Sequence, residues 1–325
     1  MKRRAFILGL GAAVVEPPLR ASAQIPGRTS RIGSLHSAPV TAPHHVAFFA
    51  ELAQAGFVAG KNVEKDPGGY GLRQEQFSAH ATELVDARVD AILCAGDLAI
   101  RTAQRLTATI PILGVTEDMV ASRLVGSLAR PDRNVTGVSI LAAKLDGKRQ
   151  EILLEMIPSL RRIALLVDSN NLSTSHLAEL EASARKAGMA LSVHRAGRVE
   201  EIPEAIRDAK SGEGNVALNV LATPLFFNNR ALIFAKVAEI GLPAIYEWPE
   251  MAEEGGLAAY GPRIVDIYRS QVSRQMVKIL RGVPIAEIPV EQPTAFELVV
   301  NLKAAKAAGL GLPPAVIARA DKVIE

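Results

Sequence analysis

Polar side chains recur in the short segments that follow strand-like apolar runs. Hydroxyl and amide groups, together with the open N–H groups at helix N-termini, suit a ligand carboxylate. Carboxylates in such segments suit a ligand amine, because they accept charge-assisted hydrogen bonds. The chemistry predicted here is reversible binding of a small polar ligand. The segments are residues 34–37, 67–71, 95–97 and 116–118 in the first half of the chain, and 168–171, 222–224, 247–249 and 260–262 in the second.

The acidic residues of these segments have two possible roles. Each can balance a ligand amine or cap the helix that follows, and capping is the commoner role. The acids are Asp97, Glu117, Asp118, Asp168 and Glu247. We select Asp97 and Asp118 as ligand contacts, and add the small or polar residues Ser34, Ser37, Gly96, Thr116, Asn170, Thr223 and Pro224.

Aromatic residues are scarce and concentrate in the same segments. Tyr70 lies between glycines in a Gly-Gly-Tyr-Gly loop, where no helix or strand is expected to use it. Tyr246 and Tyr260 end two strand-like runs, and Trp248 follows the first of them. A loop aromatic at the end of a strand usually packs on something, and a ligand is one option. We select Tyr70, Tyr246 and Tyr260 as ligand contacts; helix packing is the simpler role for at least one of Phe226 and Phe227.

The sequence gives less support to catalysis or metal binding than to ligand binding. The sequence has no G-x-S-x-G, G-x-x-x-x-G-K-[ST] or H-E-x-x-H motif, which are the usual signatures of a nucleophile elbow, a phosphate loop and a zinc site. His44 and His45, near His36, lack a further ligand of suitable spacing. We therefore interpret His44 and His45 as a solvated helix start, and expect no metal, cofactor or catalytic residue. An enzyme acting on a small molecule stays open as an alternative.

Length and composition limit the kind of fold that can position these residues. The chain has 325 residues, of which 49% are apolar, 22% charged and 4% aromatic. This length and apolar content suit two domains with their own cores and exclude a largely disordered chain. The single cysteine, Cys94, excludes an intramolecular disulfide and a cysteine-based zinc cluster.

The N-terminus has the organisation of a secretory signal peptide. Lys2, Arg3 and Arg4 precede an apolar run over residues 5–15, and Ala-Ser-Ala follows at residues 21–23. The apolar run is too short to span a bilayer, and the order fits removal of residues 1–23. The adjacent arginines also fit a twin-arginine signal. We predict an unanchored periplasmic protein.

The charge of the mature chain excludes a nucleic-acid partner. The signal peptide holds four basic side chains and one acidic side chain of the 37 and 34 in the whole chain, so 33 of each remain. A neutral chain without a basic patch does not bind a phosphate backbone.

Apolar runs alternate regularly with amphipathic helical stretches. This alternation predicts an α/β fold with parallel sheets covered on both faces. Gly56, Gly188 and Gly241 are expected to end helices. The strands are expected at residues 31–35, 62–65, 90–95, 110–115, 135–140, 162–167, 191–194, 216–221, 243–246 and 257–260, and helices at 43–55, 75–87, 144–156, 175–187 and 226–240.

Short motifs along nearly the whole mature chain resemble the substrate-binding proteins of ABC transporters, in the family that contains the tryptophan- and tyrosine-type binding components. The motifs are GSLARP at 126–131, NVTG at 134–137, GKR at 147–149, PLFF at 224–227, LPAIY at 242–246, GGL at 255–257, YGP at 260–262, PVEQPT at 289–294 and ARADKVIE at 318–325. The sequence departs from the family at Ala95-Gly96-Asp97 and at Glu117-Asp118-Met119. Relatives usually have Ser/Thr-Gly-Thr at the first place and often Gly-Asp-Pro at the second.

The resemblance implies a type I periplasmic-binding fold, with two Rossmann-like lobes joined by three crossovers. Lobe one would be residues 31–141 plus 263–290, and lobe two 142–262 plus 291–325. A small aromatic or apolar amino acid or carboxylic acid would bind between them by hinge closure. Its partner would be an ABC permease in the inner membrane, and the protein is expected to be a monomer. A sensory protein that presents its ligand to a receptor stays open as an alternative.

Overall fold

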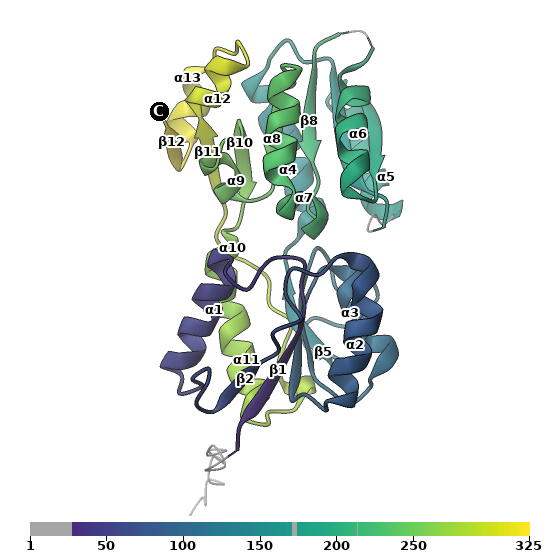
Figure 1. The fold of residues 1–325 in the computed structure, drawn as a ribbon. Helices are drawn as coiled ribbons and strands as arrows, with labels where there is room; N and C mark the ends of the chain where they lie inside the picture. Colours follow the sequence, from purple (N-terminus) through teal and green to yellow (C-terminus); the bar gives the residue numbers. More distant parts are fainter. Residues whose placement is uncertain (1–27, 171–173, 213) are drawn as a thin grey trace, which may run out of the picture.

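The computed structural model describes residues 28–170, 174–212 and 214–325 and has two lobes, one above the other in Figure 1. Each lobe has one sheet between helices, so the predicted α/β fold with two lobes is confirmed. The predicted signal peptide lies outside the described residues. Within them, no helix is both long enough and apolar enough to cross a membrane.

Lobe one is built on a five-stranded parallel sheet. Its strands lie in the order β2-β1-β3-β4-β5, and helices cover both of its faces (Figure 1). One face is covered by α1 (Pro43–Gln54), a π-helical segment η3 (Ile267–Val272) and α11 (Ser273–Leu280), and the other by α2 (Phe77–Asp86) and α3 (Asp97–Leu106). The strands are β1 (Ser30–Leu35), β2 (Val63–Lys65), β3 (Ala91–Ala95), β4 (Ile112–Thr116) and β5 (Val135–Ser139).

Lobe two is built on a seven-stranded sheet in the order β12-β11-β10-β9-β8-β6-β7. All its pairs are parallel except β10 with β11, where Ala258 lies opposite Val300. The strands are β6 (Arg162–Asp168), β7 (Ala190–Ala196), β8 (Val216–Val220), β9 (Ala244–Tyr246), β10 (Ala258–Gly261), β11 (Glu297–Asn301) and β12 (Lys322–Ile324).

The helices of lobe two divide between the two faces of its sheet. One face packs against α4 (Ala142–Met156), α5 (Thr174–Lys186), α12 (Leu302–Ala307) and α13 (Pro314–Arg319). The other face packs against α6 (Ile202–Lys210), α8 (Arg230–Glu239) and α9 (Pro249–Glu253). Both faces are therefore removed from water, which is the usual condition of a parallel sheet.

Three segments join the lobes, as predicted. The chain leaves lobe one between β5 and α4, where Leu141 takes a left-handed conformation with φ of 61°. It returns between β10 and the short helix α10 (Ile264–Asp266), and crosses again before β11. Near this last crossing, Glu291 pairs with β5 through its backbone N–H to Gly137 O and its carbonyl to Ser139 N–H, both at 2.9 Å. The lobe boundaries 31–141 plus 263–290 and 142–262 plus 291–325 stay predictions.

Most elements agree with the sequence analysis, and a few differ. The glycine caps are confirmed, because Gly56, Gly188 and Gly241 all have positive φ. The helix expected at residues 226–240 is divided at Asn229 into α7 (Pro224–Asn228) and α8. The strands β11 and β12 were not among the expected strands.

Candidate functional site

A cavity lies between the lobes, where the carboxyl ends of β4 and β9 and the loops after β3 and β8 meet. This is where open parallel sheets place their ligands. The cavity has about 490 Å³ of empty space, which is the size of a site for a small molecule. Of the twelve residues selected from the sequence, Gly96, Thr116, Thr223 and Pro224 line it.

A smaller cavity adjoins the first and shares Gly96, Thr223 and Pro224 with it. The selected residues Ser37, Asp97 and Asn170 line this second space. The two lobes are close together here: the Asn170 side-chain amide donates to Gln74 Oε1 across the gap at 3.3 Å.

Gly96 allows the lobes to approach. A Cβ atom at this position would lie 2.9 Å from Cγ of Pro224 in the opposite lobe, and Gly96 has φ of 82°. A side chain would therefore both clash with the opposite lobe and strain the backbone.

One buried aspartate in each lobe accepts a hydrogen bond from a threonine at the edge of the cavity. Asp97 Oδ1 accepts a hydrogen bond from Thr116 Oγ1 at 2.6 Å in lobe one, and Asp168 Oδ2 accepts one from Thr223 Oγ1 at 2.8 Å in lobe two. Both aspartates are buried. Burial raises the pKa of Asp168, and its hydrogen bonds from Asn170 and Thr223 oppose this shift. The threonines thus fix the carboxylates at the edge of the cavity.

Two glutamates bring acidic groups to the cavity from opposite lobes. Glu117 follows β4, and Glu247 follows β9. Burial raises the pKa of Glu247 to about 8, and among the described residues its Oε2 atom has no hydrogen-bond partner. Burial likewise raises the pKa of Glu117 well above its ordinary value, and the nearby Asp97 and Glu247 add to this shift. Desolvation therefore outweighs the favourable effect of the Arg149 charge on Glu247.

The nearby arginines are already paired. Arg149 is buried, its Nε atom donates to Asp146 Oδ1 at 3.0 Å, and Nη1 donates to the carbonyl oxygen of Tyr260 at 2.7 Å. Arg101 contacts Asp97 Oδ2 at 3.5 Å from outside the cavity. Among the described residues that line the central cavity, none is lysine or arginine.

Aromatic side chains form much of the cavity wall. Phe227 and Trp248 from lobe two meet edge to face, with their ring centroids 6.2 Å apart. Tyr268 faces them from lobe one and is fully buried. Ile140 and Ile264, near the crossovers, add apolar surface. These residues suit a ligand with an aromatic or apolar body.

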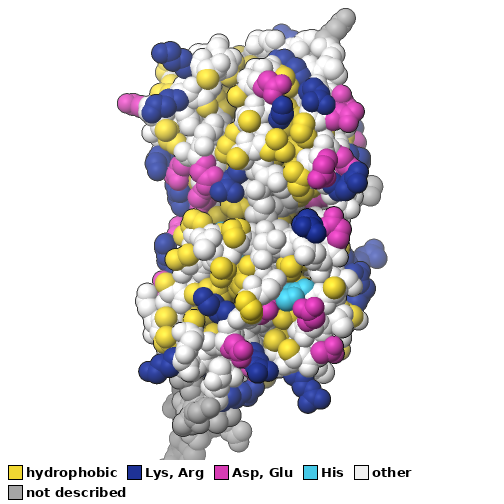
Figure 2. Space-filling model, viewed as in Figure 1, with side chains coloured by type: hydrophobic (Ala, Val, Ile, Leu, Met, Phe, Trp, Pro, Cys, Tyr) yellow, Lys and Arg dark blue, Asp and Glu magenta, His cyan; other side chains and the backbone are white. Residues whose placement is uncertain are grey.

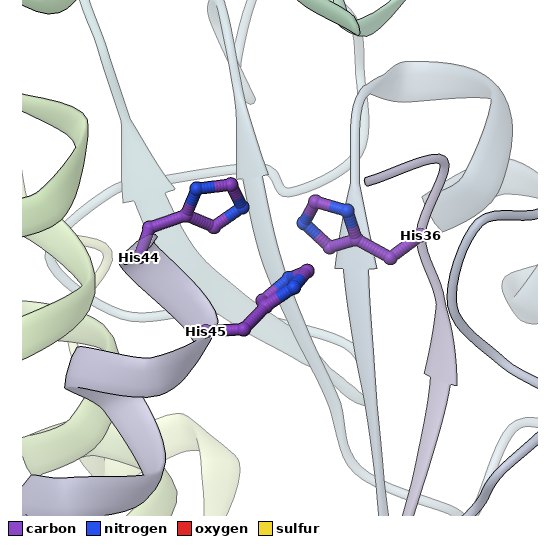
Figure 3. A group of neighbouring side chains, drawn as sticks. All are labelled: His36, His44 and His45. Carbon is purple, nitrogen blue, oxygen red and sulfur yellow. The ribbon is translucent and has the colours of Figure 1, made fainter. Parts of the chain in front are cut away.

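Three histidines surround a common space beside this wall (Figure 3). His36 follows β1, and His44 and His45 are in the first turn of α1. Their exposures are only 4%, 1% and 0%, so the interpretation of a solvated helix start is wrong. Burial lowers the pKa of His44 to about 3 and that of His45 to about 4, and it lowers the pKa of His36 as well. All three imidazoles are therefore neutral.

Three other selected residues lie within lobe one and do not line these cavities. Tyr70 packs edge to face on His45, with the centroids 4.9 Å apart, and burial raises the pKa of its phenol. Ser34 is fully buried on β1. Asp118 caps the turn after β4 by accepting from the N–H groups of residues 120 and 121.

The tyrosines selected in lobe two pack inside that lobe. Tyr246 is fully buried against Phe234, with the ring centroids 5.1 Å apart, and burial raises the pKa of its hydroxyl. Tyr260 lies near Phe296 at a centroid distance of 6.4 Å. Strand alternation accounts for this, because a side chain at the end of a strand points to one face of the sheet rather than along the strand.

The sequence analysis missed several residues that line the central cavity. Glu247 and Trp248 lie in the named segment 247–249, and Phe227 lies in the PLFF motif; each was noted without being selected. Ile264 and Tyr268 lie just beyond the YGP motif at 260–262, in a stretch that the sequence analysis did not consider. The signal that could have found Tyr268 is a polar aromatic residue just after a crossover.

The family model described as ABC transporter substrate binding protein matches residues 47–324. A comparison with curated proteins finds no match.

Solved structures with the same fold support the two-lobed architecture. A conserved domain protein from Vibrio cholerae has a TM-score of 0.82 and 22% identity, and the match covers 91% of this chain and all of that one. An ABC domain in complex with L-Trp from Streptococcus pneumoniae has a TM-score of 0.79 and 23% identity over the same shares. A ligand-free, open substrate-binding protein with adhesive properties from Clostridium difficile has a TM-score of 0.62 and 22% identity, with 91% and 99% covered.

Proposed function

This chain belongs to the ABC transporter substrate-binding protein family, and we propose that it is the solute receptor of an ABC importer. The observation that carries the proposal is the central cavity, whose wall is formed by both lobes. A ligand held there contacts Thr116 and Glu117 of lobe one together with Thr223 and Glu247 of lobe two. It therefore stabilises the closed arrangement relative to the open one.

The energy needed for such a switch is within reach of a small molecule. To invert a population from 1:99 to 99:1, a ligand needs about 5.5 kcal/mol of differential binding to the closed form. Charge-assisted hydrogen bonds, each worth roughly 1.5–3 kcal/mol, and one aromatic contact of roughly 0.5–1.5 kcal/mol beyond its buried area supply it. A permease in the membrane then distinguishes the closed receptor from the open one by shape.

The proposed ligand is a small aromatic or apolar molecule that carries an amine. The aromatic wall supports the first property, and the neighbouring structure from Streptococcus pneumoniae contains L-Trp. The carboxyl groups of Glu117 and Glu247 support the second, since a protonated amine forms charge-assisted hydrogen bonds with such groups and the described lining residues include no lysine or arginine that would compete for them. Of the classes expected from the sequence, the amino acid is thus favoured over the simple carboxylic acid.

We further propose that the receptor works in the periplasm after removal of residues 1–23, and that the permease partner lies in the inner membrane. The charges on the face in Figure 2 agree with a neutral mature chain, because basic and acidic side chains are interspersed there. Neither sign gathers into a patch on that face.

A thermal-shift screen of the purified protein tests the proposal. The screen covers amino acids, aromatic amines and aromatic acids, and a ligand at 100 times its Kd should raise the free energy of unfolding by about 2.7 kcal/mol. The ligand recovered after long incubation should be chemically unchanged. Product that forms in proportion to the protein concentration would instead establish the enzyme alternative.

A further inference from the structure

We propose that His36, His44 and His45 form a binding site for one transition-metal ion, with zinc as the natural probe, on the lobe-one side of the central cavity. His36 and His44 line the same central cavity as Glu117 and Glu247, but the three histidines alone supply the proposed metal ligands. Two elements bring its residues together: His36 comes from the loop after β1, and the other two come from the start of α1.

The geometry of the three rings fits a shared ion. One ring nitrogen of each histidine lies within 4.8 Å of those of the other two. His36 and His44 each turn a ring nitrogen toward the other, and the His45 ring lies beside them (Figure 3). Two ligands of tetrahedral zinc, each about 2.0–2.1 Å from the metal, are roughly 3.4 Å apart, so the rings need to move inward by only a small amount.

The hydrogen bonds of His45 leave one ring nitrogen ready to bind a cation. Its Nδ1 atom lies 2.8 Å from the carbonyl oxygen of Pro39 and must donate to it, because a carbonyl only accepts. The neutral ring then carries a lone pair on Nε2. Metal-binding histidines usually have this arrangement, in which a carbonyl fixes the tautomer through the other nitrogen.

Two ring nitrogens of the cluster are buried without a partner. Among the described residues, Nε2 of His44 and Nε2 of His45 make no hydrogen bond, although both side chains are almost entirely shielded from solvent. Buried polar atoms without a partner are rare in folded proteins, and each one calls for an explanation such as an ion. A metal ion between the rings would satisfy both atoms at once.

His36 completes the site by giving up one hydrogen bond. Its Nδ1 accepts from the Ala38 backbone N–H at 3.2 Å, and its Nε2 lies 2.7 Å from the Tyr268 hydroxyl. Because Nδ1 accepts, the proton of the neutral ring is on Nε2. Binding through Nδ1 replaces only the Ala38 contact, whereas binding through Nε2 moves the proton to Nδ1 and gives up both contacts. The Tyr268 hydroxyl, already beside the cluster, is placed to act as a fourth ligand or to contact a bound water.

The donor set selects the class of metal. Neutral imidazoles suit zinc, copper, nickel and cobalt, whereas calcium and magnesium require oxygen ligands. The cluster contains no carboxylate. Two features limit its affinity for any cation: the N–H groups at the start of α1 carry partial positive charge, and Arg230 lies close enough to affect His44.

Calorimetric titration with zinc tests this site in the full chain, purified without a histidine tag and freed of metal by a chelator. One zinc ion per chain should bind in the absence of any organic ligand. His44→Ala should weaken binding by at least about tenfold, since the loss of a ligand should cost no less than the loss of a group that orients one. His45→Asn should do the same while its amide still donates to the Pro39 carbonyl, so the fold is kept.

Matched controls make the result specific. His194→Ala removes a histidine of β7 in lobe two, which contacts Ser192 at 2.9 Å, and should leave zinc binding unchanged. Cobalt(II) should give the visible absorption of a tetrahedral complex in the wild type and lose it in His45→Asn. Absence of zinc binding in the wild type, or equal binding by the wild type and folded His45→Asn, would overturn the site. Because no organic ligand is present, either result leaves the receptor proposal untouched.

Discussion

Replacing Glu247 by glutamine should stabilise the protein without ligand and weaken its binding of an amine. The pKa of this carboxyl is about 8 in the folded protein, against an ordinary value of 4.5. The folded state therefore keeps a proton between pH 4.5 and 8 that the unfolded chain releases. Because the folded state binds more protons, the free energy of unfolding falls as the pH rises through this interval.

The size of the effect follows from the shift. Each pH unit between the two pKa values is equivalent to about 1.4 kcal/mol. The free energy of unfolding therefore falls by on the order of 3 kcal/mol between pH 4.5 and 7 through this one group. Glu247→Gln has no such titration. Urea unfolding at pH 5 and at pH 7 should show the variant to be the more stable protein at pH 7, with a smaller difference at pH 5. Glu239→Gln, at an exposed carboxylate of α8 paired with Lys236, is the matched control and should change neither value much.

Ligand binding gives the second half of the same test. An amine that pairs with Glu247 must drive off its proton, so calorimetry near pH 7 in buffers of different ionisation enthalpy should detect proton release. Glu247→Gln should abolish that release and weaken binding by about tenfold or more. The reasoning is refuted if Glu247→Gln is less stable than the wild type at pH 7 and binds the amine as the wild type does. That result would make the ionised carboxylate a structural partner of Arg149.

Four further outcomes follow from the placement of particular residues. Trp248→Ala should weaken binding by at least about tenfold, because aromatic contact and buried area are both lost, and calorimetry measures this. Gly96→Ala should hinder closure through contact with Pro224, which small-angle scattering should show as a ligand-bound form that is more open than the wild type. Tyr70→Ala should lower the free energy of unfolding by roughly 2 kcal/mol with unchanged ligand affinity, since Tyr70 packs on His45; weaker binding with unchanged stability would restore it as a ligand contact. Mass spectrometry of the protein from its native host should find an N-terminus at or near Gln24, and intact Met1 would contradict the predicted export.

The fold was predictable because the alternation of strands and helices in an α/β lobe depends on local sequence patterns. The strands missed by the sequence analysis, β11 and β12, lie beyond the last crossover. The first of them is the one antiparallel neighbour in the lobe-two sheet. Its position depends on a long-range pairing with β10, which local periodicity does not reveal.

The site residues that directly follow parallel strands were predictable. Thr116, Thr223 and Pro224 line the central cavity because parallel strands bring their following loops to one edge of the sheet. Loop conformation was not predictable. Tyr70, which glycines flank, forms a bridge with His36 and turns onto α1.

The sequence analysis also missed residues that are distant in the sequence and meet only in the folded protein. Tyr268 belongs to η3, about 220 residues after α1 in the chain, yet η3 and α1 pack closely and bury the histidines between them. The local sequence around His44 and His45 is typical of an exposed helix start. These histidines are buried because Tyr268 and residues of lobe two pack against them.

The most direct test of a ligand amine held between the lobes is a calorimetric comparison of three matched compounds. L-tryptophan, tryptamine and indole-3-propionate share one ring system. Tryptamine lacks only the carboxylate of L-tryptophan, and indole-3-propionate lacks only its amine. We predict one-to-one binding of L-tryptophan or tryptamine, with indole-3-propionate at least about tenfold weaker than tryptamine. Only an amine forms charge-assisted hydrogen bonds with Glu117 and Glu247, and the described residues that line the cavity include no lysine or arginine to pair with a carboxylate. Tighter binding of indole-3-propionate than of tryptamine would contradict this account of the cavity.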